Sequence, residues 1–290
     1  MSVTTVVIPV RGPAPTLSKT LALLESQRTV TDYEVLVVEN GGPCPGLKDV
    51  VDRSPVSRYM YVEEAGSYRA RNAAIRVARG DVIAFTDADC LPEADWVERG
   101  TAWVRKGYLR VAGNVRVEAI SPGRPGPVEM WETLSAFPQE RYVEDGWAVT
   151  ANLFCAAALF DSYGLFDADL MSGGDREWGL RVSRAGVPLL YDDKLVVRHP
   201  ARVTYSEMLE KLRRTSRGVF EQRVKAGEDL RSPLIEAVRG FRLPLGAMGK
   251  VLAGRGQLPL RDRLNYVLGE GGMRLLAVFA RYREARSLRD

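Results

Sequence analysis

The feature that most constrains this chain is an alternation of short apolar runs with amphipathic stretches over its first ninety residues. The run "VTTVVIPV" at residues 3–10 is rich in β-branched side chains, which favour strands, and Pro9 is tolerated near a strand end. Similar runs follow at residues 33–42, 56–64 and 82–85, separated by helical patterns at residues 16–27 and 67–81. A β-α-β-α-β order with near-continuous apolar strands predicts an α/β fold, a sheet with helices on both faces.

Both helices are predicted from the spacing of their apolar residues. In the first, Leu17, Leu21 and Leu24 recur on one face, and Thr16 stands where a cap belongs. In the second, the predicted buried stripe consists of Ala70, Ala73, Ala74 and Val77, and Gly80 is expected to end the helix.

Composition narrows the class of protein. The chain has 290 residues, enough for one or two domains, with 46% hydrophobic and 27% charged residues, as in ordinary globular proteins. Three scattered cysteines make neither a disulfide framework nor a cysteine-based zinc site, so a reducing compartment is expected. We see no targeting peptide and no run of apolar residues that could span a membrane.

Charge is divided unevenly along the chain. Residues 201–290 hold 19 Lys and Arg against 10 Asp and Glu, whereas residues 1–200 hold 22 against 27. The change marks a boundary near residue 200. A basic segment of this kind meets nucleic acid, an anionic membrane or an acidic substrate, or forms a solvated helical face, and the last is favoured.

Polar residues gather where the predicted strands end. Pro9-Val10-Arg11, Glu39-Asn40 and Asp87-Ala88-Asp89 follow three strands, and such sheets bind ligands beyond the carboxyl ends of their strands. Neither a dinucleotide-binding fingerprint nor a P-loop is present, so a bound phosphate needs another counter-charge. A divalent cation held by carboxylates supplies one, and Asp87 and Asp89 can face the same side of an extended chain.

These motifs together resemble family 2 glycosyltransferases of the GT-A fold. The similarity covers "VVIPVRG", "YEVLVVENGG", "ARNAAIRVARGDVIAFTDADCLPEADW" and "FDADLMSGGDREWGLRVSRAGVPLLYDDKLVVRHP", in the family's order, over about two-thirds of the chain. The resemblance implies a nucleotide-sugar-binding half at residues 1–95, an acceptor-binding half at 96–200 and a basic helical region at 201–290. It also implies an inverting, metal-dependent transfer of a sugar to an acceptor hydroxyl.

The resemblance assigns donor and metal residues position by position. Those expected to contact the nucleotide sugar are Pro9, Val10, Arg11, Glu39, Arg71, Asp87, Ala88, Asp89 and Asn152. Asp89 and His199, the single histidine, are the expected ligands of Mn²⁺ or Mg²⁺. "ENGG" departs from the family's usual "DDGS", which leaves a UDP-, GDP- or dTDP-linked donor open. For Arg71, a solvated helix position is the competing interpretation.

The general base implied by the resemblance is Asp175 in "SGGDREWGLR". A carboxylate there can take the proton of the acceptor hydroxyl, and a helix N-terminus is expected to favour its ionised form. Glu177 is a reserve candidate, Asp175 as a simple helix cap is the structural alternative, and Trp178 is expected in the core.

The sequence gives less specific predictions for the acceptor half and the C-terminal region. Residues 107–119 suggest a strand pair across a Gly-Asn turn, residues 121–127 a Pro/Gly loop that could be mobile, and Thr150 lies beside Asn152 near the donor sugar. Residues 261–290 suggest a basic amphipathic helix interrupted at Gly271-Gly272. We expect a glycan or lipid-linked acceptor, a cytoplasmic protein with peripheral contact at the inner face of the membrane, and no nucleic acid partner.

Two other functions remain open from the residues. A sugar-phosphate nucleotidyltransferase would use a similar sheet, although no Gly-rich triphosphate loop follows the first strand. A non-enzymatic module that binds nucleic acid or membrane would use the basic C-terminal third.

Overall fold

A computed structural model describes residues 3–121, 123–239, 249 and 259–288. The chain divides into two compact units, which are treated separately. The first unit comprises residues 1–116, 137–170 and 174–199, and the second comprises 117–136, 171–173 and 200–290. The three-part division at residues 95 and 200 stays a prediction.

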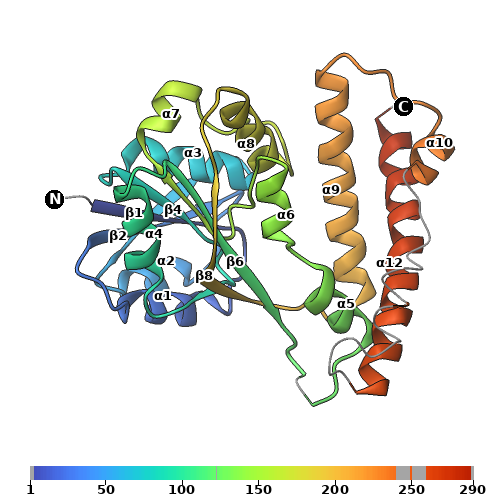
Figure 1. Cartoon of the computed structure of the whole chain (residues 1–290), viewed down its shortest axis with the longest axis horizontal. Coiled ribbons are helices and arrows are strands. Elements are labelled where there is room, and N and C mark those ends of the chain that lie inside the picture. Colours follow the sequence, from blue (N-terminus) through green and yellow to red (C-terminus); the bar gives the residue numbers. More distant parts are fainter. Residues whose placement is uncertain (1–2, 122, 240–248, 250–258, 289–290) are drawn as a thin grey trace. The chain divides into compact units, whose positions relative to one another are not determined.

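The first unit is built on an eight-stranded sheet (Figure 1). The strands are β1 Val3–Val10, β2 Asp32–Asn40, β3 Ser57–Val62, β4 Val82–Phe85, β5 Leu91–Pro92, β6 Arg110–Glu118, β7 Leu153–Ala156 and β8 Leu190–Pro200. Their order is β3-β2-β1-β4-β7-β6-β8-β5. β1 runs parallel to β2 and β4, whereas β7 is antiparallel to β4. The parallel half therefore brings the ends of β1, β2 and β4 to one edge.

Helices cover both faces of this sheet, as predicted. They are α1 Leu17–Glu25, α2 Leu47–Asp52, α3 Ser67–Val77, α4 Trp96–Arg105, α6 Gln139–Glu144, α7 Ala158–Tyr163 and α8 Gly174–Arg184. Alternate residues of β1 point to opposite faces: Val6 and Ile8 pack with α1, whereas Val7 packs with α3 and α8. Two buried clusters result, one on each face of the sheet.

The predicted strand pair at residues 107–119 is wrong, because β6 is one continuous strand. Gly113 is there to allow close approach: a Cβ on it would lie 2.2 Å from the Leu195 carbonyl oxygen and 2.3 Å from Asn152 Nδ2. The glycine marks a crowded strand interior, which the sequence alone cannot distinguish from a turn.

Three details of the predicted helices also change. α3 ends at Val77, which is exposed, and Gly80 lies beyond it, where a Cβ would come within 2.6 Å of the Thr5 amide nitrogen and the Val3 carbonyl oxygen of β1. Arg71 is buried, so the solvated interpretation of that residue is wrong. Thr16 does precede α1, but its hydroxyl donates to the Ala88 carbonyl instead of capping the helix.

The second unit is helical. It contains α5 Pro127–Ser135, α9 Tyr205–Lys225, α10 Pro233–Val238 and α12 Leu260–Ser287. α12 runs without a break through Gly271-Gly272, so the expected interruption is wrong. A Cβ on Gly269 would lie 2.1 Å from the Pro127 carbonyl oxygen, and one on Gly272 would lie 2.6 Å from the Tyr205 ring. These glycines allow α12 to pack closely on α5 and α9.

One buried carboxylate links the helices of the second unit. Glu132 on α5 is fully buried and pairs with Lys211 of α9 at 2.7 Å and with Arg202 at 3.0 Å. Burial alone would raise the pKa of Glu132, but the two cations together outweigh it and lower the pKa. Within the described residues, no helix has the length and apolar character needed to cross a membrane. Residue 122 and residues 240–248 and 250–258 lie outside the described residues.

Candidate active site at the ends of β1, β2 and β4

The two predicted aspartates lie in a tight turn that directly follows β4. The Cys90 amide donates to the Asp87 carbonyl at 3.0 Å and closes the turn. The hydroxyls of Thr16, just before α1, and of Thr20 on α1 each donate to the Ala88 carbonyl at 3.1 Å, and Thr20 also donates to the Cys90 carbonyl. The turn's backbone is thus held by α1, while the carboxylates of Asp87 and Asp89 remain partly exposed.

Asp89 and the single histidine come together, as the resemblance implies. His199 near the end of β8 places Nε2 3.5 Å from Asp89 Oδ2, and its ring lies 5.1 Å from that of Phe137. The imidazole is 5% exposed and the carboxylate 44%, so the pair has one buried and one accessible member. A carboxylate from the turn after β4 and an imidazole from β8 suit a divalent cation such as Mn²⁺.

Cys90 lies close to the same atoms. Ligand atoms of Asp87, Asp89 and Cys90 fall within 4.8 Å of one another. The thiol is fully buried, and burial, together with the nearby charges of Asp87 and Asp89, raises its pKa well above the usual value. A buried protonated thiol is a poor ligand for a hard cation, so the oxygens and His199 fit the metal better than the sulfur does.

Arg71 connects the turn to α3. Its guanidinium donates to Asp87 Oδ1 through Nη2 at 2.6 Å and lies 5.6 Å from the centre of the Tyr68 ring. The side chain is 4% exposed, and its buried Nε has no hydrogen-bond partner among the described residues. A buried guanidinium with an unused donor beside a partly exposed carboxylate is a suitable place for an anionic ligand.

Asp175 is the second residue of α8. Its Oδ1 accepts from the Tyr68 hydroxyl at 3.0 Å and from the Arg176 amide at 2.9 Å. Burial raises the pKa of Asp175, and Arg71, these two donors and the Thr150 backbone only partly oppose it. The net shift is opposite to the one that the helix N-terminus alone predicts, because desolvation outweighs it.

Tyr68 is a site residue that the sequence reasoning missed. Its ring is buried and packs against Gly174, where a Cβ would lie 2.8 Å from it, so the glycine before Asp175 is required by this contact. The position was available in the sequence, since Tyr68 lies one helical turn before Arg71 on α3. Its contact with Asp175, 107 residues away along the chain, could not be predicted from the sequence.

The neighbours of Asp175 on α8 are structural. Glu177 pairs with Arg181 at 2.8 Å, and Arg181 also donates to the Leu165 carbonyl. This ion pair gives Glu177, the reserve candidate for the general base, a structural role in α8. Trp178 is buried in the core, as predicted, with its indole N–H bonded to Gly164.

Glu39 and Asn40 end β2. Glu39 is 1% exposed and accepts hydrogen bonds from the Cys44 amide and the Tyr59 hydroxyl. Burial and Glu39 raise the pKa of Tyr59 to about 12, so this phenol stays a donor. Asn40 joins the end of β1 to the start of α3, donating to the Val10 carbonyl at 2.7 Å and accepting from the Gly66 amide at 2.9 Å.

The remaining predicted donor residues differ in access. Val10 is buried and Pro9 partly buried, whereas Arg11 is exposed beyond the end of β1. Asn152 is fully buried: its amide donates to the carbonyls of Asn114 and Leu195 and accepts from the Trp96 indole. Its polar atoms thus join β6, β8 and α4.

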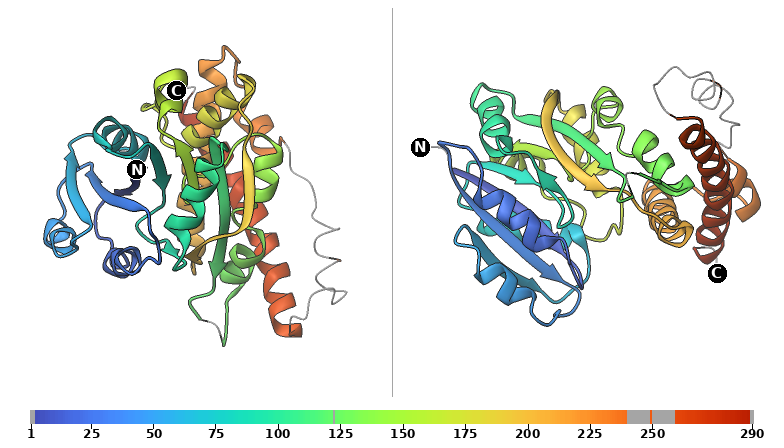
Figure 2. Two further views of the ribbon diagram at one scale, coloured as in Figure 1. Left: turned by 60° about the vertical axis from the view of Figure 1, so that its left-hand side comes forward. Right: turned by 90° about the horizontal axis from the view of Figure 1, so that it is seen from below.

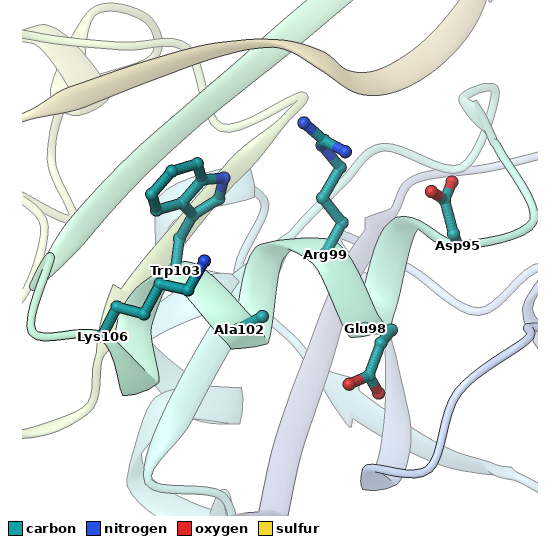
Figure 3. Close-up of a pocket in the computed structure, with 6 residues that line it drawn as sticks. All are labelled: Asp95, Glu98, Arg99, Ala102, Trp103 and Lys106. Carbon is teal, nitrogen blue, oxygen red and sulfur yellow. The ribbon is translucent and has the colours of Figure 1, made fainter.

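A shallow hollow on α4 lies outside this set (Figure 3). Its lining residues are Asp95, Glu98, Arg99, Ala102, Trp103 and Lys106. Arg99 and the Trp103 indole both donate to Asp192 of β8, at 2.6 and 2.7 Å. These bonds attach α4 to β8, and none of the predicted site residues lines the hollow.

Residues 5–164, more than half of the chain, match the family model "Glycosyl transferase family 2". The chain belongs to this glycosyltransferase family. It is 32% identical over 224 residues to glycosyltransferase AglE of Haloferax volcanii, covering 74% of this chain and 72% of that protein. It is 29% identical over 230 residues to validoxylamine A glucosyltransferase of Streptomyces hygroscopicus subsp. jinggangensis, covering 63% of this chain but only 52% of that protein.

Solved glycosyltransferase structures share the fold. Mannosyltransferase PcManGT of Pyrobaculum calidifontis, solved with GDP-Man and Mn²⁺, has a TM-score of 0.62 at 17% identity, over 95% of this chain and 86% of that one. Residues 1–349 of S. aureus TarS with UDP give 0.53 at 16% identity, over 99% and 91%. The predicted GT-A fold and glycosyltransferase family are thus confirmed, in preference to the nucleotidyltransferase and the non-enzymatic module.

Proposed function

We propose that this glycosyltransferase moves a sugar from a nucleotide-diphosphate donor to an acceptor hydroxyl with inversion, and that it needs a divalent metal. The observation that carries the proposal is the approach of His199 to Asp89 within 3.5 Å, at the turn that also holds Asp87. PcManGT, a neighbour in fold, was solved with GDP-Man and Mn²⁺, which supports this donor class and metal.

The proposed metal ligands are Asp89 and His199. A carboxylate and an imidazole accept Mn²⁺ readily, and Mg²⁺ is the alternative if oxygen ligands from the donor dominate. When bound, the ion would neutralise the diphosphate as it departs. The chain's own contribution is to hold Asp89 in the turn between β4 and β5, and His199 on β8, the strand that pairs with β5.

The donor is proposed to lie over the ends of β1, β2 and β4. Arg71 and Asp87 would contact the nucleotide, since the guanidinium is oriented by its bond to Asp87 and keeps Nε for a ligand. The proposed lining also includes Pro9, Val10, Arg11, Glu39 and Ala88. Because Asn152 uses its polar atoms inside the fold, we assign it the task of positioning β7 instead of contacting the sugar.

Asp175 is the proposed general base. The acceptor oxygen would form its bond to the anomeric carbon as the bond from that carbon to the diphosphate oxygen breaks, and the hydroxyl proton would pass to the Asp175 carboxylate. A raised pKa makes a carboxylate a stronger base, and Tyr68 and Arg176 fix its orientation through Oδ1.

The acceptor and the setting extend this proposal. We propose a glycan or a lipid-linked hydroxyl as acceptor, within glycan, polysaccharide or glycolipid biosynthesis, by a cytoplasmic protein in peripheral contact with the membrane. UDP-, GDP- and dTDP-sugars all remain donors to test, since the neighbours were solved with GDP-Man and with UDP.

A thermal-stability panel tests the donor site. The purified chain is heated with each nucleotide sugar, with and without Mn²⁺, because a ligand of the folded state raises the melting temperature. We expect one donor to stabilise the wild type only with metal, and Asp89→Asn to lose the effect. Asp52→Asn, an exposed acid paired with Lys48, is the matched control and should keep it. If no donor stabilises the wild type with metal, the proposal is wrong.

A further inference from the structure

α12 has apolar residues on two opposite sides. Its buried side chains include Tyr266, Met273, Ala280 and Ala285, which lie toward the other helices of the second unit. On the other side is a set of exposed apolar residues, called here the outer stripe: Leu260, Leu264, Leu268, Leu275, Phe279 and Tyr282. Figures 1 and 2 show α12 as a long helix lying beside α9 and α10.

The outer stripe is continuous along the helix. Successive members lie three, four or seven residues apart, so they share one face over about 33 Å of helix. Their side chains are between 38% exposed, at Tyr282, and 71% exposed, at Leu275. A contiguous apolar face of this length marks an interaction surface, whereas scattered exposed leucines would not.

Negative and positive charges on α12 lie on different sides of the helix. Two of its carboxylates, Glu270 and Glu284, are buried, where they accept from Trp131 and Arg274 and from Arg213. The third, Asp262, is half-buried in the first turn. The exposed charged residues of α12 are all arginines, namely Arg261, Arg283 and Arg286. The outward side is therefore apolar and cationic.

This distribution of charge distinguishes two candidate partners of the outer stripe, a second copy of the chain and an anionic bilayer surface. A second copy packed antiparallel would bring Arg261 near Arg283 of its partner, and a parallel copy would bring Arg261 near Arg261, with the helix's carboxylates turned inward in both cases. An anionic bilayer surface has the opposite charge and an apolar interior, so it satisfies the arginines and the leucines together.

We propose that the outer stripe of α12 binds an anionic lipid bilayer surface, with its leucines and Phe279 entering the boundary of the acyl chains and its arginines meeting the lipid phosphates. The proposal gives the peripheral membrane contact a defined helix face. It does not rest on the transferase reaction, since every residue named belongs to the second unit and none to the candidate active site.

The test is sedimentation of the full chain with phosphatidylcholine vesicles, with and without phosphatidylglycerol. We expect the wild type to bind the anionic vesicles, and the double variant Leu268→Glu/Leu275→Glu to bind them at least about tenfold more weakly. The matched control is Val219→Glu/Val224→Glu, which makes the same change at two exposed positions of α9 and should bind like the wild type. Arg261→Gln/Arg283→Gln should bind more weakly and lose much of the salt dependence.

Circular dichroism and light scattering complete the experiment. All variants should keep the helical content of the wild type, since every substituted side chain is exposed. The proposal is overturned if the wild type does not bind anionic vesicles, or if the α12 and α9 double variants bind equally. A wild-type dimer that Leu268→Glu/Leu275→Glu splits, without vesicle binding, would likewise overturn it and assign the stripe to a second copy.

Discussion

Tyr68→Phe removes one oxygen atom from the candidate active site and leaves its packing in place. The ring would keep its contacts with Gly174 and with Phe166, whose centre lies 5.6 Å away, and its position beside Arg71. The lost interaction is the 3.0 Å hydrogen bond to Asp175 Oδ1, while the Arg176 amide at 2.9 Å remains. A hydrogen bond to a charged group contributes about 1.5 kcal/mol, so we expect turnover to fall roughly tenfold.

The pH dependence identifies the cause of that fall. The Tyr68 hydroxyl lowers the pKa of Asp175 by bonding its ionised form, so its removal should raise that pKa further. A base must be deprotonated to act, hence the acid limb of kcat/KM should move to higher pH. Nucleoside diphosphate release across pH measures this limb.

A matched variant separates this effect from a general loss of fold. Tyr142→Phe removes another phenol whose pKa is raised by burial and by Asp175, and that phenol's ring stacks on Trp147 at 4.0 Å. The acid limb of kcat/KM for Tyr142→Phe should stay close to that of the wild type. If Tyr68→Phe keeps the wild-type acid limb while Asp175→Asn is inactive, Tyr68 does not position the base. If Asp175→Asn is fully active, the assignment of the base is itself wrong.

Three further predictions concern stability. Gly269→Ala should lower the free energy of unfolding in denaturant by about 2 kcal/mol, since its Cβ would lie 2.1 Å from a carbonyl oxygen. Gly271→Ala, where the added Cβ meets open space, should raise it by about 0.5–1 kcal/mol. Equal effects of the two substitutions would contradict the packing of α12. Glu132→Gln should lower the free energy of unfolding by about 2 kcal/mol at neutral pH. Because the pKa of Glu132 is lowered in the fold, its contribution to stability should be lost as pH falls below the ordinary carboxyl range. A difference between variant and wild type that does not change with pH would refute this. Asp175→Asn should raise the melting temperature at neutral pH, since a raised carboxyl pKa means that ionisation of Asp175 destabilises the fold. The gain in melting temperature should shrink as the medium becomes acidic. A gain that grows in acid would show that ionisation of Asp175 does not destabilise the fold.

The local parts of the fold could be predicted from the sequence. β1, β2 and β4 follow from β-branched runs, and the turn carrying Asp87 and Asp89 follows from polar residues after a buried strand. The family resemblance pointed to Asp89 and His199, and the structure places them 3.5 Å apart, while their role as metal ligands stays a prediction.

The parts that failed depend on neighbours distant in sequence. Gly113 has the composition of a turn, but the Leu195 carbonyl decides its role. Asn152 as a contact of the donor sugar stays a prediction, but its bonds to Trp96, Asn114 and Leu195 could not be predicted from the sequence. The pKa of Asp175 follows its burial more than its helix position, and burial is a property of the whole fold.

The proposed function requires metal-dependent transfer from a nucleotide sugar. It is tested most directly by the rate of nucleoside diphosphate release from the donor that stabilises the chain, measured with Mn²⁺, after EDTA, and after excess Mn²⁺ is restored. We expect release with metal, its loss in EDTA, and its recovery on adding Mn²⁺, with Asp89→Asn inactive throughout. An undiminished rate in EDTA, or full activity of Asp89→Asn, would contradict it.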